Sequence, residues 1–329
     1  MTIHTGFAPD AARARALDRR MHAELAASLR HVCERSRGIV PFDEKGMGRL
    51  IGSLQAATPH SPLVFARYYA LVTALLENDD REAAALFERL SSASPASPEQ
   101  TVAPLDEPHT SARGAVYRDM MTGDEDAEIG IVPPRPDVAA AFRERYRRAM
   151  ALVDEVMPEL GGEIRAIVRE VVLVAADPAR DTVFQGGSHF QLWGALFLNA
   201  ELHPTVEAVV EVVAHESAHS LLFGFCTEEP LVHNPDEDLY PSPLRADPRP
   251  MDGIYHATFV SARMHRALSR LIESGRLSEE SQAGAIRART EDRNNFEAGY
   301  RVVAEHGDLS GVGRALMDGA RAYMDAAPG

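Results

Sequence analysis

The segment His215-Glu216-Ser217-Ala218-His219 is the part of the sequence whose residue types and spacing point most directly to chemistry. On an α-helix, residues four apart lie one above the other, so the two imidazoles can bind one metal ion. Glu216 then lies about 100° round the helix axis from His215. The preceding residues, VEAVVEVVA, are apolar and compatible with a helix. We therefore predict a two-histidine metal site on a helix, with two merely hydrogen-bonded histidines as the alternative.

A metal site of this kind needs at least a third protein ligand, which must be sought downstream. We choose His256, because it lies in GIYHATFV at the start of an otherwise apolar helix, where an imidazole without a partner is costly to bury. A hydrogen-bonded core histidine is the alternative interpretation. Carboxylates could instead complete a site of two histidines and one carboxylate, and spacing does not choose among them. The candidates are Asp236, Asp238, Asp252 and Glu297.

The segment SPLRADPRP, residues 242–250, lies between the two histidine segments and carries two arginines. Arg245 and Arg249 bracket the turn at Asp247-Pro248. If this turn lies over the metal, either guanidinium could bind a carboxylate of a cosubstrate with two parallel hydrogen bonds. The alternative is an exposed loop whose arginines pair with its own aspartate.

Composition and charge exclude several classes of protein. The chain has 329 residues and a net charge of −15, which repels a phosphate backbone, so we predict no nucleic-acid partner. The single lysine, Lys45, lies outside any GxxxxGK[ST] loop, which excludes a Walker-type nucleotide site. Cys33 and Cys226 are the only cysteines, too few for a disulfide framework or a cysteine-built metal site. Any metal must therefore be held by histidine and carboxylate.

Hydropathy predicts neither a membrane span nor a secretory signal. No run of about 18 apolar residues occurs, and the first 20 residues have no apolar core segment. We expect a cytoplasmic protein without a membrane partner.

The pattern of apolar residues predicts an α+β fold that is mostly helical, with a small β-sheet packed beside a zincin-like HExxH metal-binding helix. A stretch rich in Ser and Pro at 91–113 indicates a linker. It divides the chain into an N-terminal helical region, 1–112, and a metal-binding catalytic domain, 113–329. The expected helices span 9–36, 61–77, 81–92, 138–156, 204–224, 254–273 and 279–305. Strands are expected at 171–175 and 192–199, where Trp193 and Gly194 either border an edge that accepts an extended peptide or belong to the core.

From the motif alone, the first candidate is a zinc metallopeptidase of the zincin type. His215, His219 and a third ligand would hold Zn²⁺, and Glu216 would act as general base on its water. The second candidate is a non-haem iron oxygenase, in which the same histidines hold Fe(II) and an arginine neutralises the distal carboxylate of a 2-oxo acid. A peptidase has no need of such an arginine pair. The third is a non-catalytic, metal-stabilised peptide-binding protein, against which the complete HESAH motif argues mildly.

The order of three segments resembles a known family. HESAHSLL is followed by YPSPLRADPRPMDGIYHATFV and then by a helical tail, which is similar to the HExxH-motif proteins of ribosomal peptide (RiPP) biosynthetic clusters. The resemblance is strongest from about residue 185 to 265 and weaker from about residue 60 to the C-terminus. Members of that family are regarded as 2-oxoglutarate- and Fe(II)-dependent peptide β-hydroxylases, which act on a precursor peptide.

The resemblance implies a role for each of the residues singled out above. His215 and His219 would be iron ligands, His256 the third ligand, and Arg245 and Arg249 the anchors of 2-oxoglutarate.

Under this interpretation the glutamate of the motif, Glu216, loses its hydrolytic role and orients a ligand or water instead. An all-histidine triad differs from the familiar iron site of two histidines and one carboxylate, so the four carboxylates stay as alternatives. The oligomeric state is not determined by the sequence.

Overall fold

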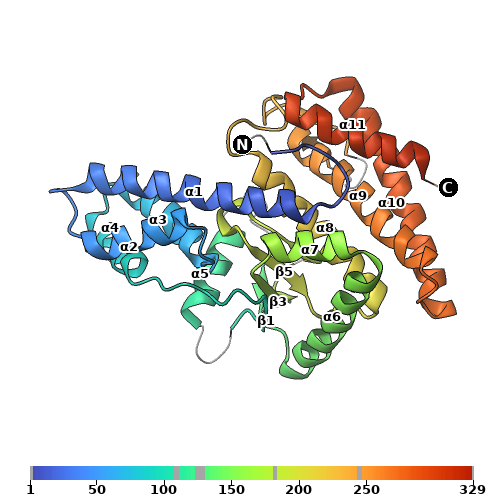
Figure 1. Cartoon of the computed structure of the whole chain (residues 1–329), viewed down its shortest axis with the longest axis horizontal. Coiled ribbons are helices and arrows are strands. Elements are labelled where there is room, and N and C mark those ends of the chain that lie inside the picture. Colours follow the sequence, from blue (N-terminus) through green and yellow to red (C-terminus); the bar gives the residue numbers. More distant parts are fainter. Residues whose placement is uncertain (1–2, 107–110, 123–129, 181–183, 243–246, 328–329) are drawn as a thin grey trace. The chain divides into compact units, whose positions relative to one another are not determined.

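The computed structural model describes residues 3–106, 111–122, 130–180, 184–242 and 247–327 (Figure 1). The chain forms two compact units, each assembled from separate stretches of sequence. Unit 1 contains 1–14, 140–164 and 201–329, and unit 2 contains 15–139 and 165–200. The predicted division at residue 112 falls inside unit 2, so the compact units do not follow it. The expectation of an α+β fold that is mostly helical is confirmed.

Unit 2 contains most of the N-terminal helices. They are α1 (Ala11–Ser36), which begins in unit 1, α2 (Glu44–Gln55), α3 (Leu63–Leu76), α4 (Asp80–Ser91) and α5 (Ser111–Thr122). The helices predicted over 9–36, 61–77 and 81–92 are confirmed to within a few residues. The sequence did not predict α2, because three glycines lower its helix propensity. Asp43 nonetheless caps α2 by accepting a hydrogen bond from the backbone N–H of Lys45.

A five-stranded sheet lies in unit 2. Its strands are β1 (Thr101–Pro104), β2 (Ile131–Val132), β3 (Glu170–Ala176), β4 (Gly186–Gly187) and β5 (Ala195–Asn199). The order is β1-β3-β5-β4, and β2 pairs with β3. β1, β3 and β5 are parallel, in a register that aligns Thr101 with Glu170 and Glu170 with Ala195. Every residue of β5 is buried, as expected for a parallel strand covered on both faces.

One sequence expectation about this sheet is wrong and one alternative is decided. The stretch 91–113 is not simply a linker, because β1 pairs with β3 and α5 begins at Ser111. β5 pairs with β3 on one side and, at Phe197 and Leu198, with β4 on the other. Trp193 belongs to the core: its side chain is buried, and its indole N–H donates a 2.9 Å hydrogen bond to Asp18.

Unit 1 carries the helices that hold the candidate site. They are α6 (Pro136–Val156) and α7 (Pro158–Ile167), which cross into unit 2 at one end, α8 (Val206–Phe225), α9 (Met251–Glu273), α10 (Glu279–His306) and α11 (Gly311–Ala326). α9 packs against α8, α10 and α11 and is therefore the central helix of the unit (Figure 1, orange). A short hairpin, β6 (Leu239–Tyr240) with β7 (Arg249–Pro250), leads directly into it. Within the described residues, no helix combines the length and apolar character that crossing a bilayer requires.

A buried charge cluster fastens α9 to the N-terminal segment and to α7. Glu163 accepts hydrogen bonds from the guanidinium groups of Arg13 and Arg263, the former at 2.9 Å, and from the backbone N–H of Asp10. The three charged side chains are each at most 2% exposed. Arg263 also donates a 2.8 Å hydrogen bond to the carbonyl of Phe7. Removal of this carboxylate would leave two buried cations without a counter-charge, which strongly destabilises the folded state.

We expect Glu163→Ala to lower the free energy of unfolding by about 3–5 kcal/mol, because it leaves two buried guanidinium groups without a counter-charge. Chemical denaturation measures the change. Glu159→Ala, an exposed glutamate on the same helix, is the control and should cost less than about 0.5 kcal/mol. Equal losses in both variants would contradict this account of the cluster.

Acidic side chains meet where α8 packs against α10. Asp292 is 3% exposed, and its Oδ2 has no hydrogen-bond partner within the described residues. Burial, followed by the charges of Glu211 and Glu291, raises the pKa of Asp292 to about 9. Burial and the same kind of repulsion raise the pKa of Glu211 to about 7. The folded protein therefore keeps protons here that the unfolded chain releases near its ordinary carboxyl pKa of 3.8.

Between about pH 4 and pH 9 the folded state binds more protons at Asp292 than the unfolded state, so stability falls as pH rises through this window. We expect Asp292→Asn to flatten that decline by up to about 1.4 kcal/mol per pH unit. Urea unfolding at about pH 5 and about pH 8 measures the slope. Glu305→Gln, an exposed site on the same helix, should leave the slope unchanged, and an equally steep slope in the Asp292 variant would refute the assignment.

Candidate metal centre

Helices α8 and α9 bring the three predicted histidines together. His219 lies between the other two: its Nε2 is 3.1 Å from Nε2 of His215, and its Nδ1 is 3.0 Å from Nδ1 of His256. The helices run antiparallel here, because His215 contacts Met264 while Phe223 contacts His256. The face of α8 that carries the two motif histidines therefore packs against the face of α9 that carries His256 and Met264. The structure thus places His256 beside the motif histidines, from 37 residues away in sequence.

The ring contacts form a chain in which each donor has an acceptor. A thioether sulfur can only accept, and Sδ of Met264 lies 3.3 Å from Nδ1 of His215. We therefore assign Nδ1–H of His215 as the donor to Met264, Nε2–H of His219 as the donor to His215, and Nδ1–H of His256 as the donor to His219. Each imidazole then carries one proton and is neutral.

Burial keeps these imidazoles in the neutral form. It lowers the pKa of His215 to about 4, with a further contribution from the charge of His203. It lowers the pKa of His219 well below its ordinary value, helped by the two flanking histidines, and it lowers the pKa of His256 despite the opposing charge of Asp252. Neutral imidazole is the form that binds metals. Proton competition for the three ring nitrogens is accordingly weak at neutral pH.

The chemistry of the donor set suits a metal, although the ring orientations do not yet surround one point. Among the described residues, no three His, Cys, Asp or Glu side chains are arranged to hold an ion together. The cause is His219, which turns Nε2 to His215 and Nδ1 to His256. Rotation about the terminal side-chain torsion of histidine is soft, and a metal held by all three rings would require such rotations. The side chain of His215 is 30% exposed, which leaves the cluster accessible from one side.

The carboxylates near the cluster differ in their availability. Glu216 is buried, and its Oε1 lies 3.9 Å from Nε2 of His215. Asp252, one turn before His256 on α9, has its Oδ1 3.9 Å from Nε2 of that histidine and is exposed. Glu297 instead pairs with Arg321 at 2.8 Å. Asp236 and Asp238 are exposed in the segment before β6. Of the four carboxylate alternatives, only Asp252 is shown next to a candidate ligand.

The arginine segment is described only in part. Arg245 lies outside the described residues. Arg249 is on β7, seven residues before His256, and its Nε is 2.8 Å from Oδ2 of Asp247. Its side chain is 27% exposed, whereas that of Asp247 is 60% exposed. Pairing with the aspartate of its own loop, one of the two sequence interpretations, is what the structure shows for Arg249.

Three neighbours of the histidines were missed by the sequence analysis. Met264 contacts His215, the ring of Phe223 lies 5.5 Å from that of His256, and His203 lowers the pKa of His215. A periodic signal was present for two of them. Phe223 follows His219 by four residues, and Met264 follows His256 by eight, so each continues the histidine-bearing face of its helix. His203 precedes α8, and no spacing connects it to the cluster.

Comparison of the sequence with known protein families and with curated proteins finds no match.

We expect His219→Ala to lower the affinity for Co²⁺ or Fe²⁺ by more than about a hundredfold, because it removes the central ring of the cluster. Anaerobic equilibrium dialysis with metal analysis measures this loss. His265→Gln is the matched control, since His265 is buried on α9 but bonds to Tyr323. Glu216→Gln should retain the metal. Undiminished loading in the His219 variant would exclude these histidines as ligands.

Proposed function

We propose that the protein is an Fe(II)- and 2-oxoglutarate-dependent oxygenase that hydroxylates a side-chain Cβ of a ribosomally made precursor peptide. The observation that carries this proposal is the meeting of His215, His219 and His256, from two helices, as neutral imidazoles. His256 is buried and the other two are half-buried. The resemblance of the surrounding segments to peptide β-hydroxylases supplies the reaction type.

The three imidazoles would hold the metal without first losing a proton, because burial lowers the pKa of each. Fe(II), when bound with 2-oxoglutarate and O₂, would supply the oxidising power for an unactivated C–H bond. The reaction balances with one oxygen atom entering the peptide as hydroxyl and the other entering succinate, with release of CO₂. Met264 and Phe223 line the cluster with apolar surface and would limit the access of water to it.

Arg249 would anchor the distal carboxylate of 2-oxoglutarate, together with Arg245. Its present partner Asp247 is 60% exposed, and ion pairs of that kind contribute little to stability. Exchange of one carboxylate for another therefore costs little. The proximity of β7 to the start of α9 in the chain couples this arginine to the helix that carries His256.

Glu216 would act as a positioning residue, because its buried carboxylate lies beside His215 and can fix the orientation of that ring. The same observation favours the second candidate function, a zinc metallopeptidase of the zincin type, in which Glu216 would be the general base. A non-catalytic, metal-stabilised peptide-binding protein remains the third proposal. The three functions differ in which metal and which small molecule they require.

The discriminating experiment is anaerobic loading of the full chain with Fe(II), followed by addition of a candidate precursor peptide, 2-oxoglutarate and O₂. We expect the peptide to gain the mass of one oxygen while succinate forms in equal amount. Arg249→Gln should raise the KM for 2-oxoglutarate at least about tenfold and leave Fe(II) loading unchanged. Arg147→Gln, an exposed arginine that pairs with Glu144, is the charge-matched control.

Cleavage of the peptide by the Zn²⁺-loaded chain without 2-oxoglutarate would replace the oxygenase by the peptidase. In that case Glu216→Gln should abolish cleavage with the metal retained. Tight metal binding that raises the unfolding temperature, without either reaction, would favour the peptide-binding protein.

A further inference from the structure

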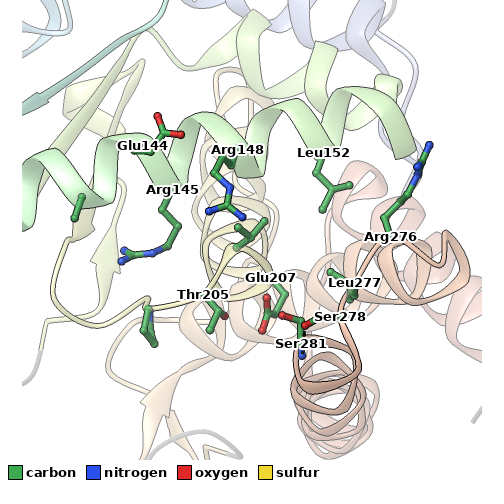
Figure 2. Close-up of a pocket in the computed structure, with 13 residues that line it drawn as sticks. Glu144, Arg145, Arg148, Leu152, Thr205, Glu207, Arg276, Leu277, Ser278 and Ser281 are labelled. Atoms are coloured by element: carbon green, nitrogen blue, oxygen red, sulfur yellow. Dashed lines mark hydrogen bonds between the residues drawn. The ribbon is translucent and has the colours of Figure 1, made fainter.

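A cavity of about 700 Å³ lies in unit 1, away from the histidines along α8. It is lined by one face of α6, by the N-termini of α8 and α10, and by the turn that follows α9 (Figure 2). Its volume is within the range of about 300–1,000 Å³ that is common for small-molecule sites. Glu207, on its wall, precedes His215 by eight residues, which corresponds to about 12 Å along the helix. The cavity is therefore separate from the candidate metal centre.

Two arginines of α6 project into this cavity. Figure 2 shows both side chains extending from α6 on the side of the cavity where Thr205 lies, with Arg145 farther than Arg148 from Ser278 and Ser281. Within the described residues, no hydrogen bond or ion pair engages either guanidinium, and Arg145 only lies over the ring of Phe142 at 5.8 Å. Arg276, at the edge of the cavity, is instead paired with Glu155. Neither guanidinium forms an ion pair within the described residues, because Glu144, the carboxylate that lines the cavity beside them, pairs with Arg147. Both groups can therefore bind an anion.

The opposite wall contains the N-termini of two helices, whose first turns also carry Glu207, Glu279 and Glu280. Thr205 and Ser278 line it as the N-caps of α8 and α10, helices of 20 and 28 residues. Each cap side chain satisfies only one backbone N–H of its first turn, that of Ala208 and that of Ser281 respectively. The remaining N–H groups of the first turns and the helix dipoles favour an anion at this position.

Glu207 adds a carboxylate that can accept a hydrogen bond from a ligand. It lines the same cavity and is only 7% exposed, and its Oε2 has no hydrogen-bond partner within the described residues. In Figure 2 its carboxylate lies on the side of the cavity formed by Ser278 and Ser281, across from the arginines. A buried carboxylate oxygen without a donor costs free energy. A ligand that brings a donor to this end of the cavity would offset that cost.

We propose that this cavity binds a small organic anion with two recognition ends. A phosphate or carboxylate group is held by Arg145 and Arg148 near the N-termini of α8 and α10. A hydroxyl or ammonium group on the same molecule donates a hydrogen bond to Glu207. The guanidinium forks accept phosphate and carboxylate alike, so the experiment separates these two sources of the anion.

The test uses isothermal titration of the full chain with four probes, after metal has been removed on a chelating resin so that no metal offers a second carboxylate site. Glycerol 3-phosphate carries carbon-bound hydroxyl groups that inorganic phosphate lacks, and malate carries one that succinate lacks. We expect the hydroxyl-bearing member of at least one pair to bind more tightly than its partner. The pair that binds more tightly identifies the anion as phosphate or carboxylate.

Arg145→Gln combined with Arg148→Gln should weaken that binding at least tenfold. Arg143→Gln combined with Arg314→Gln removes the same charge from exposed residues that do not line the cavity, and should change the affinity less than twofold. Glu207→Gln should reduce the preference for the hydroxyl-bearing probe. Circular dichroism and thermal unfolding confirm that each variant is folded.

Three results would overturn the proposal: no heat of binding for any probe up to about 10 mM, equal weakening in the two double variants, or an unchanged preference in the Glu207 variant. Each is independent of metal loading and of oxygenase activity. Absence of anion binding would therefore leave the proposed oxygenase function intact. Absence of oxygenase activity would likewise leave the anion site intact.

Discussion

The contact between α8 and α9 is the interaction on which the candidate metal centre depends. The helices pack antiparallel, so His215 meets Met264 and His219 meets His256. Neither helix alone can assemble the cluster: α8 contributes two of the histidines and α9 the third. The buried pairing of Arg263 with Glu163 and with the carbonyl of Phe7 holds α9 in place about two turns beyond His256. Structural support and candidate chemistry thus belong to the same helix.

In unit 1, burial lowers the pKa of the three histidines and raises the pKa of Asp292, so both kinds of group stay uncharged. It keeps the three imidazoles neutral, and it keeps Asp292 protonated by raising its pKa to about 9. Both effects arise because a low-dielectric surrounding disfavours a charged group. Where charge does persist in the interior, as at Glu163, two guanidinium groups compensate it. The three histidines consequently add no positive charge to the helix interface at neutral pH.

The predicted helices and central strands matched the structure because they are long or strongly patterned. α8 combines the HExxH spacing with a cap at Thr205, and β3 and β5 are continuous apolar runs. Elements that rely on partners were missed. β1 is a four-residue strand within a stretch rich in Ser and Pro, and only its pairing with β3 makes it a strand. α2 contains three glycines and depends on packing against α4.

The sequence by itself determined that His215 and His219 share one helix face, because an i, i+4 spacing is a local property of the α-helix. It also showed that cysteine and lysine chemistry are nearly absent. Only the tertiary structure decided that His256 joins the pair and that Glu297 is committed to Arg321. Such choices depend on which helix faces pack together, and residues far apart in the chain carry no local signal of that packing. The same reason hid the cavity beside α6, whose walls come from three separate segments.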